Sequence, residues 1–238
     1  MPPLLKIERV TFEHLQPMGS LTLLQDVCLE VQEGECIAIV GPSGCGKSTL
    51  LRLINGLLSP THGQILFKGQ PVQEVNLETA MVFQSIALLP WLSVEENVAL
   101  GLEARGYLPA ECRRRAGFYL SKMGLEGFEE AYPRELSAGM QQRAGLARAL
   151  AVEPALLLMD EPFSALDTLT AINLREEVLD LWSDPSVRMN TVILVTHNIE
   201  EAVEMANRVV VLSRQPGRPI ADIPIEIPRP RDKHSAEF

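Results

Sequence analysis

The sequence has no long apolar segment and no visible export signal. Its apolar runs, such as those at 155–159 and 209–212, are a quarter or less of the roughly 20 residues that a helix needs to cross a bilayer. No transmembrane segment is therefore expected. The first residues lack the basic region and the apolar region of a secretory signal, which predicts a cytosolic protein.

Cysteines are few, and the chain has no large block of basic residues. The four cysteines (Cys28, Cys36, Cys45 and Cys112) form no C-x-x-C pair and show no metal-ligand spacing, so we expect reduced, structural thiols. The chain has 21 Lys and Arg against 31 Asp and Glu, a net charge of −10. Binding along a nucleic acid depends on clustered Lys and Arg, so this class of partner is not expected.

Glycine and proline, at 16 and 17 of 238 residues, fall short of a low-complexity composition, and 46% of the residues are hydrophobic. A chain of this length and composition buries a core without disulfides. The sequence therefore predicts a globular protein of one or two domains.

Apolar segments alternate with helical patterns along much of the chain. We expect strands at 6–12, 27–32, 35–40, 64–68, 155–160 and 192–196, and a helix at 48–58. Strands that alternate with helices predict a parallel sheet. The part from about 88 to 150 shows helical patterns broken at Pro90, Pro109 and Pro133, which indicates a helical insertion. The proline-rich segment after Leu212 is expected to be extended and on the surface.

A glycine-rich loop lies between a predicted strand and a predicted helix, and its sequence fits the pattern G-x-x-x-x-G-K-[ST]. Small residues let successive backbone N–H groups converge on phosphate oxygens at a helix N-terminus, whose dipole attracts anions. Lys47 is expected to reach the β and γ phosphates, and the Ser48 hydroxyl to bind Mg²⁺. The residues predicted to bind nucleotide here are Gly41, Pro42, Ser43, Gly44, Cys45, Gly46, Lys47, Ser48 and Thr49.

Two acids follow a buried strand pattern at 155–159. Asp160 and Glu161 are expected at the carboxyl edge of the sheet, where ligands gather in parallel sheets, so Lys47 and Asp160 can meet there. Asp160 is the candidate metal ligand. Glu161 is the candidate catalytic base that orients the attacking water.

Together these motifs resemble the nucleotide-binding subunit of ATP-binding cassette (ABC) transporters, over almost the whole chain. Residues 136–143 (LSAGMQQR) are similar to the family's signature sequence, 164–167 (SALD) to its D-loop, Gln84 to its Q-loop and His197 to its switch histidine. The resemblance implies an α/β P-loop NTPase with a mixed central sheet, a small antiparallel β subdomain and an inserted helical subdomain. One nucleotide-binding domain would span 1–230, with its helical insertion at about 88–150, and 231–238 would form a C-terminal tail.

The resemblance also implies two subunits that share ATP. The signature residues Ser137, Ala138 and Gly139, with Asp167, would contact an ATP held by the P-loop of a second copy or a close homologue. Gln84 and His197 would act at the γ-phosphate as catalytic residues, and Gln84 would also bind the metal. The chain departs from the family pattern at Ala138, where a glycine is usual, and at Met140, where a glutamine is usual.

The family stacks adenine on an aromatic ring four residues after a valine of the first strand. Counting from Val10 gives His14, with Phe12 two residues earlier, and either ring could stack on the base. The apolar strip at 87–94 would receive the membrane subunit, with Trp91 as an anchor or as a core residue. By contrast, Glu200, Glu201 and Glu204 are interpreted as solvated charges on an ordinary helix face.

Finer similarity points to the nitrate, sulfonate, taurine and bicarbonate importer branch, on the segments 88–97, 161–167, 196–202, 216–219 and 228–231. It implies an ATPase at the cytoplasmic face of the cell membrane, with transmembrane permease subunits, a periplasmic or lipid-anchored solute-binding protein, and ATP and Mg²⁺. Two alternatives have different signatures. A soluble ABC ATPase that remodels nucleic acid or ribosomes predicts tandem cassettes or a basic surface, and a P-loop kinase gives no role to residues 136–143.

Overall fold

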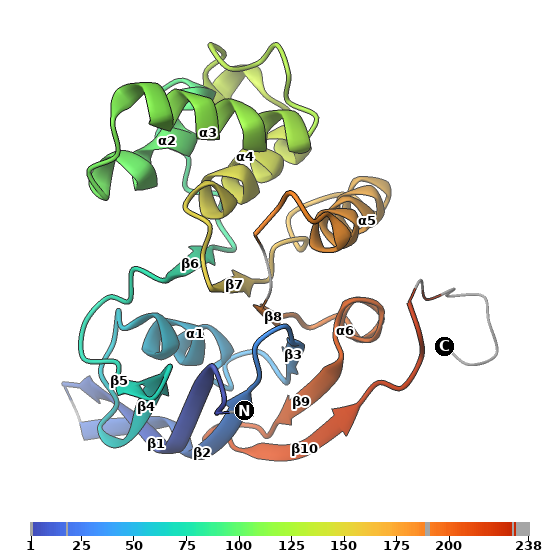
Figure 1. Ribbon diagram of the computed structural model, residues 1–238. Coiled ribbons are helices and arrows are strands. Elements are labelled where there is room, and N and C mark those ends of the chain that lie inside the picture. Colours follow the sequence, from blue (N-terminus) through green and yellow to red (C-terminus); the bar gives the residue numbers. More distant parts are fainter. Residues whose placement is uncertain (1, 18, 189–190, 230, 232–238) are drawn as a thin grey trace. The chain divides into compact units, whose positions relative to one another are not determined.

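The computed structural model describes residues 2–17, 19–188, 191–229 and 231 (Figure 1). The chain divides into two compact units, one formed by residues 1–77 and 190–238 and the other by residues 78–189. The tail predicted at 231–238 lies outside the described residues, except for Arg231. No helix in the described part of the chain is long and apolar enough to cross a membrane.

The first unit contains an antiparallel sheet of four strands in the order β2-β1-β4-β5. Its strands are β1 (Leu5–Gln16), β2 (Gly19–Val31), β4 (His62–Phe67) and β5 (Gln70–Pro71). Side chains alternate along β1, because Leu5 and Ile7 are buried while Lys6 and Glu8 are partly exposed, as expected for a sheet with one face on the core. The register shifts near Arg9, where φ is +48°.

A mixed sheet lies in the same unit. The strands β3 (Cys36–Val40), β8 (Thr191–Val195) and β9 (Arg208–Leu212) are parallel, and β10 (Pro219–Pro224) is antiparallel to β9. Almost all residues of β3 and β8 are buried, which is typical of strands covered on both faces. The helices of this unit are α1 (Lys47–Asn55) and α6 (Ile199–Met205).

Strand β10 was not predicted, since the tail after Leu212 was expected only to be extended. Prolines lie at both ends of β10 and reduce its sequence signal, but they are tolerated because β10 is the last strand in the sheet order. The strands predicted at 27–32 and 35–40 belong to different sheets. The connection at 33–34 therefore joins two sheets.

The second unit is mainly helical. Its helices are α2 (Val94–Ala104), α3 (Pro109–Lys122), α4 (Ala138–Ala151) and α5 (Thr168–Ser183), with a 3₁₀ turn at Pro133–Glu135. The strands β6 (Thr79–Val82) and β7 (Leu156–Asp160) form a parallel pair. Pro109 was expected to break a helix, but it begins α3. Proline has no backbone N–H, and the first turn of a helix needs no N–H donor, so proline is tolerated there.

The predicted fold class is confirmed. The chain is α/β, with a mixed sheet that contains parallel strands and a separate antiparallel sheet.

Candidate functional site

The glycine-rich loop connects β3 directly to the N-terminus of α1. Gly44 and Gly46 have φ angles of +77° and +99°, in the left-handed region that only glycine adopts without cost. The helix begins at Lys47, and Leu50 N donates to Gly46 O at 2.8 Å. The loop therefore wraps the N-terminus of a helix, as anion binding requires.

Lys47 is buried, with 6% of its surface exposed. Its Nζ donates to Gly41 O at 2.9 Å and to Pro42 O at 3.2 Å. These carbonyls hold the ammonium group within the loop that the motif predicted.

The glycine-rich loop at 41–49, called the P-loop below, packs against Leu24 and Gly217. A Cβ on Gly46 would lie 2.7 Å from Leu24 Cδ2, and a Cβ on Gly217 would lie 2.0 Å from Cys45 O. Gly217 N also donates to Leu23 O at 2.8 Å. Sequence reasoning missed the contribution of Gly217, although its position between two prolines in the segment Pro-Gly-Arg-Pro was a possible signal.

The two candidate adenine rings lie on β1 and differ in exposure. Phe12 is partly buried and pairs with Leu24, whereas His14 is exposed and pairs with Leu21. Because Leu24 contacts Gly46 of the P-loop, the register of β1 favours Phe12. The adenine contact itself remains a prediction.

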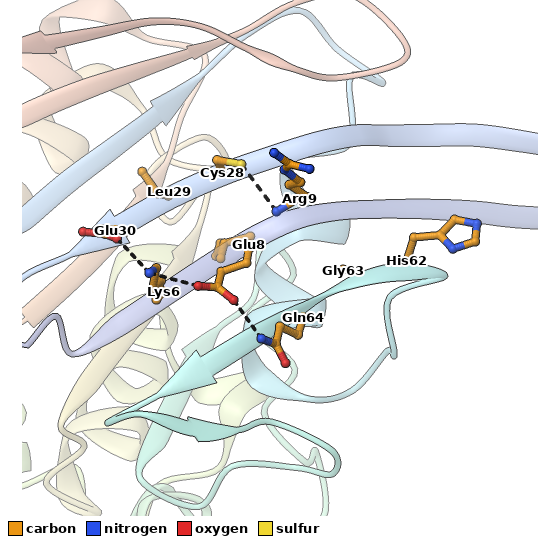
Figure 2. Close-up of a pocket in the computed structure, with 10 residues that line it drawn as sticks. Lys6, Glu8, Arg9, Cys28, Leu29, Glu30, His62, Gly63 and Gln64 are labelled. Carbon is orange, nitrogen blue, oxygen red and sulfur yellow. Dashed lines mark hydrogen bonds and ion pairs between the residues drawn. The ribbon is translucent and has the colours of Figure 1, made fainter.

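A hollow of about 700 Å³ lies on the antiparallel sheet (Figure 2). Lys6 Nζ lies 2.9 Å from Glu8 Oε1 and 3.4 Å from Glu30 Oε1, and Gln64 Nε2 donates to Glu8 Oε2 at 2.7 Å. Hydrogen bonds to Glu8 and Glu30 raise the pKa of Lys6, while Gln64 and Lys6 lower that of Glu8. Among the described residues, the lining includes none predicted to bind nucleotide, so we do not assign the nucleotide to this hollow.

His197 follows β8 in the first unit, and its side chain is exposed. On one side of it, Thr196 N donates to Ile39 O of β3 at 3.3 Å. On the other side, Asn198 caps α6 by accepting from Glu200 N and Glu201 N at 2.9 and 3.3 Å. The histidine therefore occupies a short turn between a strand and a capped helix.

The interpretation of the glutamates of α6 as solvated charges was wrong for two of them. Glu201 and Glu204 are 8% and 6% exposed, and only Glu200 is exposed. Glu201 accepts a hydrogen bond of 2.6 Å from Thr196 Oγ1, which provides a partner that a buried carboxylate needs. Helical spacing could not reveal this partner, because Thr196 precedes the helix.

The second unit contains the two acids. Asp160 ends the buried strand β7 and is 4% exposed. Glu161 follows with φ of +47°, a conformation that is uncommon outside glycine. Ser164 supports it, because its N and Oγ both donate to Glu161 O, at 3.2 and 2.9 Å.

Gln84 lies beside Glu161. Its Nε2 donates to Glu161 Oε2 at 3.3 Å. Gln84 follows β6 and Glu161 follows β7, and the carboxyl ends of paired parallel strands meet at one edge.

The signature residues lie at the N-terminus of α4. Ser137 caps the helix by accepting from Met140 N at 3.3 Å, and the helix begins at Ala138. A Cβ on Gly139 would lie 2.7 Å from Thr170 Cγ2. Close packing against α5 therefore favours glycine at this position.

Asp167 is the N-cap of α5 in the same unit. Its carboxylate accepts from Thr170 Oγ1 at 2.6 Å and from Thr170 N at 3.1 Å. These two hydrogen bonds lower the pKa of Asp167. Thr170 thus connects the signature helix with the D-loop.

Trp91 is 69% exposed, so the core alternative is wrong. Its loop is held by Asn97, whose side chain accepts from Leu89 N at 2.7 Å and donates to Leu89 O, Leu92 O and Ser93 O. Asn97 is fully buried. Trp91 is therefore exposed on a loop whose backbone is held by Asn97.

The predicted site residues are divided between the two units. The P-loop, Phe12, His14 and His197 belong to the first. The second contains Gln84, Ser137, Ala138, Gly139, Asp160, Glu161 and Asp167. The expectation that Lys47 and Asp160 meet remains a prediction.

Residues 24–164 match the family model described as ABC transporter. The chain is 44% identical over 234 residues to an uncharacterised ABC transporter ATP-binding protein of Methanocaldococcus jannaschii, covering 98% of this chain and 86% of that protein. It is also 42% identical to a nitrate import ATP-binding protein of Synechococcus elongatus, over 92% of this chain and 80% of that one. An aliphatic sulfonates import ATP-binding protein of Bacillus licheniformis is 42% identical, over 91% and 83%.

Solved structures that are similar to this chain are also ATP-binding cassettes or parts of ABC transporters. A dimeric ATP-binding cassette in a post-hydrolysis state, bound to ADP and phosphate, is 32% identical, with a TM-score of 0.81 over 94% of this chain and 99% of that chain. The protein cbiO1 from Clostridium perfringens, part of an ABC transporter complex, is 27% identical, with a TM-score of 0.80 over 94% and 90%.

Proposed function

This chain belongs to the ABC transporter family, and from that membership we propose that it is the ATP-hydrolysing subunit of an importer for a small anionic solute. The loop that wraps the N-terminus of α1 and holds the buried Lys47 is the observation that carries this function. The nitrate and sulfonate import proteins among its relatives support the class of solute. Nitrate, sulfonate, taurine and bicarbonate remain open as the solute.

The P-loop would bind the phosphates of ATP. Gly44 and Gly46 have positive φ angles, a conformation that lets backbone N–H groups converge on phosphate oxygens. The dipole of α1 attracts the negative charge. Lys47 exchanges its hydrogen bonds to loop carbonyls for bonds to the β and γ phosphates. Phe12 or His14 would stack on the adenine.

The donor atoms fit Mg²⁺. Ser48, Gln84 and Asp160 offer a hydroxyl, an amide and a carboxylate oxygen, which are the hard ligands that this ion prefers. Within the described residues, no group of three or more His, Cys, Asp and Glu side chains is arranged to hold a metal ion. Phosphate oxygens and water would supply the remaining ligands. Bound Mg²⁺ neutralises charge that develops on the phosphates.

Glu161 is the candidate base for hydrolysis. It would accept a proton from the attacking water as the new oxygen–phosphorus bond forms and the bond from the γ-phosphate to ADP breaks, which gives ADP and phosphate. Gln84 orients the Glu161 carboxylate through their hydrogen bond of 3.3 Å. His197 would donate a hydrogen bond to the γ-phosphate.

Two copies, or one copy and a close homologue, would close on ATP. The N-terminus of α4 offers a second site for an anion, where Ser137, Ala138 and Gly139 would contact the γ-phosphate held by the partner's P-loop. Asp167 would lie beside the same interface. The dimeric cassettes among the similar structures support this arrangement.

The working assembly would include transmembrane permease subunits and a periplasmic or lipid-anchored solute-binding protein. The exposed Trp91 and its fixed loop form the candidate contact with the permease. With such a contact, the chain would be a peripheral subunit at the cytoplasmic face of the cell membrane. A role in remodelling nucleic acid or ribosomes receives no support from the names of these relatives.

The test is nucleotide-dependent dimer formation by the Glu161→Gln variant. This variant should bind ATP and Mg²⁺ and remain dimeric by mass measurement, because it lacks the base that ends the ATP-bound state. The matched control, Lys47→Ala with Glu161→Gln, should stay monomeric. A Glu161→Gln variant that binds ATP and remains monomeric, or a wild-type chain that transfers phosphate to a small acceptor, would refute the proposal.

A further inference from the structure

We propose that Thr196 and Glu201 are positioning residues that fix the turn carrying His197 for ATP hydrolysis. The inference rests on the role proposed above for His197. Neither residue is placed in contact with ATP. Both would act through the backbone on each side of the histidine.

Thr196 is buried, with 1% of its surface exposed, and it forms hydrogen bonds in three directions. Its Oγ1 donates to Glu201 Oε2 at 2.6 Å and accepts from Asn198 N at 3.0 Å. Its backbone N donates to Ile39 O at 3.3 Å. The residues immediately before and after His197 are therefore tied to each other.

Glu201 closes the network from α6. Glu201 is 8% exposed, and burial of a carboxylate is costly unless it is hydrogen-bonded. The hydrogen bond of 2.6 Å from Thr196 Oγ1 therefore offsets part of the cost of burying the Glu201 carboxylate. Its backbone N donates to Asn198 Oδ1 at 3.3 Å, so the same helical turn holds both neighbours of the histidine.

This arrangement leaves the imidazole exposed while its backbone is fixed. A group that contacts the reacting phosphate must be held closely, since a displacement of about 1 Å can cost about 100-fold in rate. Nucleotide affinity depends mainly on the P-loop, which is made of other residues. Loss of the network should therefore reduce kcat far more than it changes the KM for ATP.

The experiment compares two buried threonines: Thr191 begins β8, and Thr196 directly follows its last residue. Thr196→Val removes the hydroxyl that binds Glu201. Thr191→Val is the matched control, because Thr191 is also 1% exposed and its Oγ1 accepts from Gly34 N at 3.0 Å, at the far end of the strand. Steady-state ATP hydrolysis by the purified chain gives kcat and KM, and thermal unfolding gives stability.

We expect Thr196→Val to lower kcat about tenfold or more with KM changed less than about twofold. Both valine variants should lower the melting temperature by similar amounts, but Thr191→Val should leave kcat within about twofold of wild type. Thr196→Ser, which keeps the hydroxyl, should restore kcat. A fall in kcat that is equal in the two valine variants, or no rescue by serine, would overturn the inference.

Glu201→Leu tests the other half of the pair. If the hydrogen bond between Thr196 and Glu201 holds the turn in place, Thr196→Val and Glu201→Leu each break the same bond. Their effects on kcat should then not add in the double variant. Effects that multiply would show that the two residues act independently and would refute the pair. A wild-type chain without ATPase activity would instead contradict the function itself, so the two failures are distinguishable.

Discussion

The side-chain amide of Gln84 lies 3.3 Å from the carboxylate of Glu161. The two residues are 77 positions apart, but each follows a strand of the parallel pair β6 and β7. Glu161 is further held in a left-handed conformation by Ser164. The candidate base therefore has its carboxylate oriented by one neighbour and its backbone by another.

Removal of this amide should slow hydrolysis without preventing ATP binding. We expect Gln84→Ala to lower kcat about tenfold, because the Glu161 carboxylate loses its orientation. Gln84→Glu should be worse, since two adjacent carboxylates repel and the Glu161 carboxylate would be pushed out of position. Phosphate release measured beside ATP binding tests both variants. Equal loss of binding and of kcat would contradict the orienting role.

Lys47 should control stabilisation of the chain by ATP. At about 100 times its Kd, ATP stabilises the folded state by about 2.7 kcal/mol, which corresponds to a rise in Tm of about 5–10 °C for a chain of this size. Lys47→Ala should abolish this rise. Ser43→Ala keeps the backbone amides of the loop and should retain it. An unchanged thermal shift in Lys47→Ala would show that nucleotide binds elsewhere.

The contact between Gly139 and Thr170 predicts a compensating pair of substitutions. Gly139→Ala adds a Cβ 2.7 Å from Thr170 Cγ2, so it should destabilise the chain by about 1–2 kcal/mol, although alanine is the better helix former. Thr170→Ser removes that methyl and keeps the hydroxyl bound to Asp167. The double variant should recover stability and ATP-dependent dimer formation. Additive losses in urea unfolding would exclude the contact as the cause.

Gly217 should tolerate no side chain. A Cβ there would lie 2.0 Å from Cys45 O, and neither backbone can move without disturbing the P-loop. Gly217→Ala should cost about 1–3 kcal/mol in the free energy of unfolding and weaken ATP binding.

Gly117 within α3 provides the control for this prediction. A Cβ added there would meet no atom within 4 Å among the described residues, apart from its own helical backbone and chain neighbours. Gly117→Ala should therefore stabilise the chain by up to about 1 kcal/mol, and the opposite signs form the test.

Glu111 should make stability depend on acidic pH. Hydrogen bonds from Arg114 and Arg115 lower the pKa of Glu111 from 4.5 to about 2. A carboxyl whose pKa is lower in the folded state stabilises it above the unfolded value, and this contribution is lost as the pH falls from 4.5 toward 2. Wild type should therefore exceed Glu111→Gln in stability at neutral pH and approach it at low pH. A constant difference in urea unfolding across this range would contradict the prediction.

The fold class, the P-loop and the order of the motifs could be predicted from the sequence. The P-loop is local, because its glycines and Lys47 lie within nine consecutive positions between a strand and a helix, so the pattern itself requires the conformation. The buried runs at β3, β7 and β8 likewise indicate strands wherever their partners lie. Local chemistry is sufficient for such features.

Other features depend on which segments pack together. The burial of Glu201, the packing of Gly217 on Cys45 and the closeness of Gly139 to Thr170 all involve a neighbour that no sequence pattern names. The free energy of burying a polar group depends on the partner that another segment supplies. A glutamate is therefore solvated on one helix but buried and hydrogen-bonded on another. Residue order thus establishes which chemistry the chain can carry, while packing across distant segments establishes which side chains hold that chemistry in place.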